Sequence, residues 1–169
     1  MPMRKMSRLI VPIAIGLFLV ACASTPELNT QGVDKSMTAQ VAQKNINSAT
    51  GKRVLWGGMI MSAKNLPNKT EIEVLAFPLD DWNQPNQSAT ATGRFLAEHD
   101  GYLELADYAR GRWLTLTGTV QGAQAGKVGE ATYQFPVVRT DGMHLWPKES
   151  SGGSSGTQFQ FGIGIGVIK

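Results

Sequence analysis

From residue 53 to residue 146 the sequence consists of short apolar runs separated by turn residues, with no long helical periodicity. The run over 70–77 is representative, because Ile72, Val74 and Ala76 fall on one face and two glutamates on the other. Such alternation is typical of a half-buried strand. The pattern predicts a mainly β chain with five strands, over 54–60, 70–77, 93–97, 112–120 and 130–138.

Spacing between the strands indicates how they are connected. An irregular connection over 99–111, with a helical turn near 105–108, separates the third strand from the fourth, and a Gly-rich turn is expected over 122–129. Five short strands with a break at this place fit the small, partly open barrel known as the OB-fold. Gly57-Gly58 predicts a bulge or tight bend, and Pro136 predicts an edge or a bulge. A β-sandwich remains the competing architecture.

The only cysteine follows an apolar run. Three basic residues precede the run over 9–20, and small residues then lead to Cys22. This is the layout of a secretory signal, and the run is too short to span a bilayer. The tetrapeptide Leu-Val-Ala-Cys resembles the lipobox of bacterial lipoproteins, which implies cleavage of residues 1–21 and lipidation of Cys22. A buried free cysteine and a transmembrane anchor are the alternatives.

The signal also carries the excess of positive charge. The chain has 16 basic and 13 acidic residues, and the three extra basic residues are Arg4, Lys5 and Arg8. The remaining chain is formally neutral, which does not support a nucleic-acid partner. Without Cys22, no thiol is left for a disulfide or a metal site.

Two polar segments flank the predicted barrel domain of residues 51–148. Residues 22–50 are rich in Ser, Thr, Gln and Asn and predict a flexible tether, in which Val33, Met37 and Val41 allow a short helix. Residues 149–169 combine a Ser/Gly linker with alternating Phe, Ile and Val against glycine. This tail is expected to add as a strand to an edge of its own domain, to pair with a partner or a second copy, or to stay disordered.

Several short motifs occur in an order that resembles the Slp family of outer-membrane lipoproteins, which is named for starvation-inducible members. They are Val54–Gly58, Glu73-Val74-Leu75, Pro78-Leu79-Asp80, Gly93–Leu96, Gly111-Arg112, Leu114–Gly118, Gly129-Glu130, Tyr133 with Phe135 and Pro136, and Leu145-Trp146. One departure is Leu103-Glu104-Leu105, where the family often has Leu-Asp-Pro before a tyrosine. The resemblance implies an outer-membrane lipoprotein that faces the periplasm and has no established catalytic activity. Ala23 fits a location in the outer membrane, because an aspartate after the lipidated cysteine typically retains such proteins in the inner membrane.

Catalytic and metal chemistry have little support in the sequence. No Gly-x-Ser-x-Gly motif or P-loop is present, so neither an enzyme nor a cofactor is expected. An N/O metal site is conceivable, but the spacing matches no strong ligand motif and no metal site is predicted. Its members would be His99, Asp100, Glu104, Asp107 and His144.

A ligand-binding face is the alternative function. OB-folds bind ligands on the second and third strands and the adjoining loops, and aromatic stacking contributes to that binding. The candidate residues are Trp56, Trp82, Arg94, Tyr102, Arg112 and Trp113. Core packing is the favoured interpretation of Trp56 and Trp113, and turn chemistry that of Asp80-Asp81. The chain is therefore read as a lipid-anchored barrel with a role in envelope maintenance or stress, or alternatively as a binding module for a glycan, a peptidoglycan fragment or an envelope protein.

Overall fold

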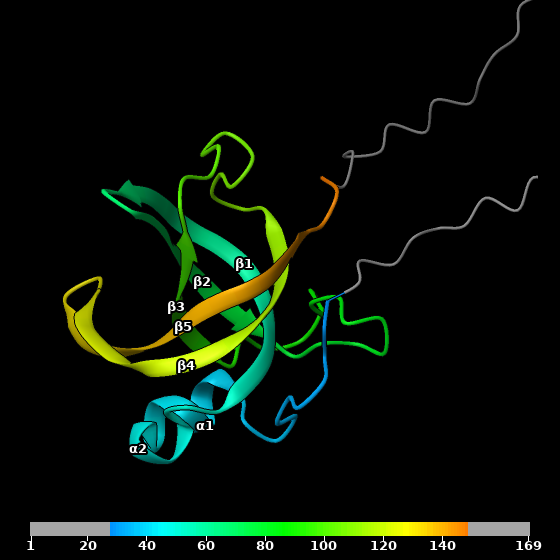
Figure 1. Ribbon diagram of the computed structural model, residues 1–169, viewed down its shortest axis with the longest axis vertical. Helices are drawn as coiled ribbons and strands as arrows, with labels where there is room; N and C mark the ends of the chain where they lie inside the picture. Colours follow the sequence, from blue (N-terminus) through cyan, green and yellow to red (C-terminus); the bar gives the residue numbers. More distant parts are fainter. Residues whose placement is uncertain (1–27, 149–169) are drawn as a thin grey trace, which may run out of the picture.

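Five strands close into a barrel in the computed structural model, which describes residues 28–148 (Figure 1). The strands are β1 (Arg53–Leu66), β2 (Lys69–Phe77), β3 (Gly93–Asp100), β4 (Trp113–Val128) and β5 (Ala131–Leu145). Their order is β1-β2-β3-β5-β4, and β4 pairs with β1 to complete the ring. Neighbouring strands are antiparallel except β3 and β5, which are parallel. The predicted mainly β, OB-like barrel is confirmed, with a closed ring rather than a partly open one.

The barrel interior is filled by alternate side chains of every strand, as the period-2 geometry of strands requires. Phe95 is fully buried and meets Trp56 edge-on, with ring centroids 5.1 Å apart. The other fully buried apolar side chains of the strands are Val54, Ile60, Ile72, Val74, Ala97, Leu114, Leu116, Val120 and Val138. One contiguous core therefore holds the five strands together.

Two short helices, α1 (Ala39–Lys44) and α2 (Ile46–Ala49), cover one end of the barrel (Figure 1). The side chain of Thr38 caps α1 by accepting a hydrogen bond from the N–H of Val41 at 3.2 Å. Val41 itself is 39% exposed, whereas the core takes in Met37, Ala39, Ala42 and Ala49. Residues 28–50 thus differ from the expected flexible tether, because small alanines let the helices pack closely on the barrel. The expected signal and Cys22 lie outside the described residues, as does the tail after residue 148.

The expected turn over 122–129 is wrong. Strand β4 continues to Val128, and the chain reverses only at Gly129-Glu130, where Gly129 has a φ of 60°. The ladder between β4 and β5 accounts for the difference, since it runs without interruption from Gly122 to Val128. Glycines that suggested a turn instead lie in a long two-stranded extension.

This extension curls over the outer surface of β3. The Tyr133 hydroxyl accepts a hydrogen bond from the N–H of Arg94 at 2.9 Å, and Phe135 packs with Leu96 and Val137 in a second apolar cluster. Pro136 pairs with Ala123 of β4 but precedes the β3 ladder, which begins at Val137. Its missing N–H therefore faces an unpaired edge, in agreement with the sequence.

Gly58 lies where β1 and β2 leave no room for a side chain. A Cβ at this position would lie 1.9 Å from the carbonyl oxygen of Leu75 on β2. The expected bulge at the glycine pair lies further along, between Ile60 and Ser62. Within 28–148, no helix has the length and apolar character needed to cross a membrane.

Candidate functional site

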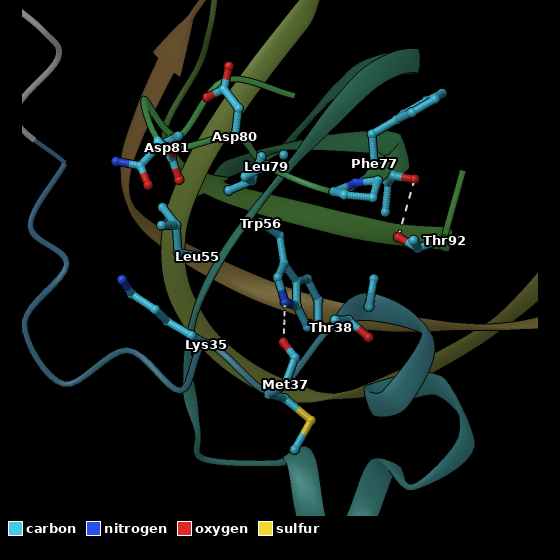
Figure 2. Close-up of a pocket in the computed structure, with 15 residues that line it drawn as sticks. Lys35, Met37, Thr38, Leu55, Trp56, Phe77, Leu79, Asp80, Asp81 and Thr92 are labelled. Carbon is cyan, nitrogen blue, oxygen red and sulfur yellow. Dashed lines mark hydrogen bonds between the residues drawn. The ribbon is translucent and has the colours of Figure 1, made fainter. Parts of the chain in front are cut away.

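A cavity of about 440 Å³ opens between β1, the β2–β3 loop (78–92) and the segment that leads into α1 (Figure 2). Its wall is mainly apolar in residue type, with a smaller number of polar residues. The apolar lining residues include Met37, Leu55, Trp56, Phe77 and Leu79, and the polar ones include Lys35, Thr38, Asp80, Asp81, Asn83 and Thr92. Such a mixture suits a ligand that carries both apolar and polar groups.

Trp56 forms the inner wall of this cavity. Its indole N–H donates a hydrogen bond to the carbonyl of Met37 at 2.5 Å, and only 5% of the residue is exposed (Figure 2). The opposite side of the indole packs against Phe95 in the core. The residue therefore belongs to the core and also limits the depth of the cavity.

The backbone of Leu55 is directed toward the cavity. The N–H of Ile60 donates to the carbonyl of Arg112, next to β4. Backbone N–H and C=O groups point to alternate sides along β1, so those of Trp56 face β4 and those of Leu55 face the β2 side. The β1–β2 ladder, however, ends at the pair Gly57–Phe77, and the chain turns away at Pro78. Within residues 28–148, no strand lies opposite Leu55 on that side, so its N–H and C=O have no strand partner there.

The β2–β3 loop is fixed to the outside of the barrel. The carboxylate of Asp80 accepts hydrogen bonds from the N–H groups of Trp82 at 2.9 Å and Gln84 at 2.8 Å. The Thr115 hydroxyl donates to the carbonyl of Asn83 at 2.7 Å and accepts from the indole N–H of Trp146 at 2.9 Å. The loop therefore presents a defined wall to the cavity.

Lys35 and Asp81 place charges of opposite sign at the edge of the cavity. Both side chains are exposed, and neither is part of any ion pair in the described portion of the chain. They are available to charged groups of a ligand.

Three of the six predicted ligand residues lie at or beside this cavity. Trp56 lines it, Trp82 is 70% exposed on the loop beside it, and Trp113 packs edge-on against Phe77 of its wall at 5.1 Å.

The other three lie elsewhere. The Arg94 guanidinium pairs with Glu73 at 2.5 Å, and the Tyr102 hydroxyl donates to the carbonyl of Pro67 at 2.7 Å. Arg112 donates to the carbonyls of Asp107 and Trp146. The six residues therefore do not form one surface.

The β4–β5 extension brings Tyr133 and Phe135 over β3, and the strand residues on the outer surface of β2 and β3 form ion pairs. These are Lys64–Glu71, Lys69–Glu98, Arg94–Glu73 and Arg139–Asp100. The sequence analysis did not identify Lys35 and Leu55 as lining residues of a ligand site. The available signal was Pro78, because it follows the last residue of β2 that pairs with β1.

The acidic and histidine residues near β3 are dispersed. Asp100 pairs with Arg139, and His144 lies on β5 with its ring edge-on to Trp146 at 4.5 Å. Burial lowers the pKa of His144. In residues 28–148, no three His, Cys, Asp or Glu side chains are grouped so that they could hold a metal ion.

Comparison with known proteins gives one consistent family. A family model described as "Outer membrane lipoprotein Slp family" matches residues 19–161. "Outer membrane protein Slp" of Escherichia coli K12 is 30% identical over 138 residues, which cover 79% of this chain and 72% of that protein. "Uncharacterized lipoprotein YeaY" of the same strain is 31% identical over 134 residues, covering 77% and 67%.

Among solved structures, the single-stranded DNA binding protein Rim1 from the mitochondria of S. cerevisiae matches with 11% identity and a TM-score of 0.36. The match covers 56% of this chain and 94% of that one.

Proposed function

The chain belongs to the Slp family of outer membrane lipoproteins, and from this premise we propose that lipid on Cys22 holds the barrel at the periplasmic face of the outer membrane. There it serves envelope maintenance during starvation or other stress and catalyses no reaction. The observation that carries the proposal is the lipobox-like Leu-Val-Ala-Cys, which ends at Cys22 within the region matched by the family.

The energetics of attachment are favourable. Each buried methylene contributes about 0.8 kcal/mol, so that one acyl chain anchors a protein only marginally and two or more anchor it stably. The diacylglycerol and the acylated amino terminus of a lipoprotein supply three chains. Attachment at Cys22 is therefore effectively permanent.

Cell fractionation tests this proposal. The natural chain is expected in the outer-membrane fraction, and the Cys22→Ala variant is expected to lose that location. A protease added outside should spare the barrel in intact cells and cleave it after the outer membrane is opened. Cleavage in intact cells would contradict the periplasmic orientation, and an unchanged location of Cys22→Ala would contradict lipid attachment.

The stress role has its own test. Cells that lack the protein should show increased uptake of an impermeant dye during starvation, and the natural chain should restore the barrier while Cys22→Ala should not. Equal dye uptake with and without the protein would contradict this role.

A second function, the binding of a peptidoglycan fragment, is supported by the cavity beside Trp56. Such fragments carry sugar rings, amides, carboxylates and ammonium groups. The N–H and C=O of Leu55, which lack a strand partner, fit an amide, while Lys35 and Asp81 fit the two kinds of charge. The aromatic wall fits the apolar faces of sugar and side chains.

Tryptophan fluorescence measures this binding directly. Soluble disaccharide-peptide fragments should shift the emission of the protein in a saturable way, and the double variant Lys35→Glu/Asp81→Lys should weaken the apparent affinity about 10-fold or more, as expected for two lost charge contacts. Lys127→Glu, an exposed change on the far β4–β5 extension, is the control and should have no effect. No saturable shift, or the same affinity in all three proteins, would remove this second function.

A further inference from the structure

We infer that the face of the barrel around Trp82 and Trp146 rests on the lipid surface, with the indole of Trp82 inserted among the lipid headgroups. This orientation depends on the proposed lipidation of Cys22. It adds to that proposal which face of the barrel meets the membrane and which side chain makes the contact.

The first observation is where the described chain begins. The side chain of Leu28 lies 3.2 Å from the position that a Cβ on Gly142 would occupy, and Gly142 pairs with Thr117 of β4. The guanidinium of Arg53 holds the same segment by donating to the carbonyl of Asn29 at 2.8 Å. The chain therefore enters the domain over the outer surface of β4 and β5.

The second observation is that the β2–β3 loop is fixed to the same surface. Thr115, which binds the carbonyl of Asn83, lies two residues from Thr117 on the same face of β4, at a distance of about 7 Å along the strand. Trp146 donates its indole N–H to the same Thr115 hydroxyl. Figure 1 shows this loop and the two ends of the described chain on the side away from the β4–β5 extension.

The third observation is the short distance to the lipid. Six peptide units separate Cys22 from Leu28, and they can span at most about 20 Å. A lipidated Cys22 therefore keeps this face, rather than the β4–β5 extension, nearest to the membrane.

The fourth observation is the exposure of Trp82 itself. This side chain is 70% exposed on a loop whose backbone is held by Asp80, although a tryptophan buries a large apolar surface when it can. Tryptophan favours the membrane–water interface, where its ring meets lipid and its N–H meets water. The adjacent carboxylates of Asp80 and Asp81 favour a zwitterionic surface over a strongly anionic one.

Fluorescence quenching by brominated lipid tests the inference. The full native chain, with its lipid on Cys22 verified by intact mass, is placed in phosphatidylcholine vesicles with and without brominated acyl chains. Bromine should quench the emission of the natural protein, and Trp82→Phe should lose most of the quenchable emission.

A transplanted indole provides the matched control. Tyr102 is 67% exposed and bonds to Pro67 at the β1–β2 turn, so Trp82→Phe/Tyr102→Trp moves an equally exposed ring to another part of the barrel. The emission of the indole introduced by Tyr102→Trp should be insensitive to bromine. Quenching that is unaffected by Trp82→Phe, or equal quenching of the transplanted indole, would overturn the inference while leaving lipid attachment intact. A chain that carries no lipid and does not float with vesicles would overturn both proposals.

Discussion

The indole N–H of Trp56 and the backbone carbonyl of Met37 form a 2.5 Å hydrogen bond that joins β1 to the segment before α1. Both residues are buried. The same bond fixes one wall of the cavity. A single interaction therefore connects the N-terminal segment, the barrel core and the candidate ligand site.

Replacement of Trp56 by Phe is expected to reduce the free energy of unfolding by about 2–3 kcal/mol. The change removes the donor, leaves the Met37 carbonyl unpaired and opens a small void beside Phe95. Urea denaturation followed by circular dichroism measures the loss. Trp82→Phe is the control and should stay within about 0.5 kcal/mol of the natural chain, because Trp82 is exposed. Equal effects of the two changes would show that the buried bond does not stabilise the fold.

Replacement of Gly58 by Ala should be much more damaging than replacement of Gly126. A Cβ at Gly58 would lie 1.9 Å from the rigid Leu75 carbonyl, whereas one at Gly126 would meet the Phe135 ring at 2.9 Å, and the ring can shift. We expect a loss of about 3 kcal/mol or more for Gly58→Ala and about 1 kcal/mol for Gly126→Ala. Thermal unfolding of the two variants provides the comparison, and a similar loss in both would contradict the strand contact at Gly58.

Acid should weaken the attachment of the N-terminal segment through Asp34. Hydrogen bonds from Lys52, at 2.7 Å, and from Ser36 lower the pKa of Asp34 from 3.8 to about 2. Because the folded chain favours the charged form, this stabilisation is complete above pH 3.8 and is lost as the pH falls toward 2. Stability measured across this range should decline less in Asp34→Asn than in the natural chain. Parallel pH profiles would contradict the role of this ion pair.

Deletion of residues 157–169 is expected to leave the barrel folded and to reduce self-association. The edges of β4 and β5 over 122–128 and 131–136 have no second strand partner within the described residues, and the alternating tail has the pattern of an added strand. Light scattering in detergent measures the size of the assembly. An unchanged size would contradict association through the tail.

Alternation predicted the strands well wherever one face is buried. Ile72, Val74 and Ala76 point into the core because a shift of one residue would expose all three. The extension of β4 and β5 was missed because its stability comes from pairing between distant residues, while its own Gly, Ala and Gln residues resemble a turn. The packing of Ala39 and Ala42 was missed because small side chains give a weak amphipathic signal.

The candidate site depends on geometry that side-chain patterns do not encode. The N–H and C=O of Leu55 lack a strand partner because β2 ends opposite Gly57 while β1 continues toward Arg53. Aromatic composition predicted a ligand surface, but Arg94, Tyr102 and Arg112 bond to other parts of the chain.

Lipid attachment at one sulfur atom underlies the proposed location and orientation, and intact mass spectrometry of the protein purified from its own membrane tests it directly. The account predicts a chain that begins at Cys22 and carries a diacylglycerol on the thiol and an acyl group on the amino terminus. A chain that retains residues 1–21, or one with an unmodified thiol at Cys22, would contradict it.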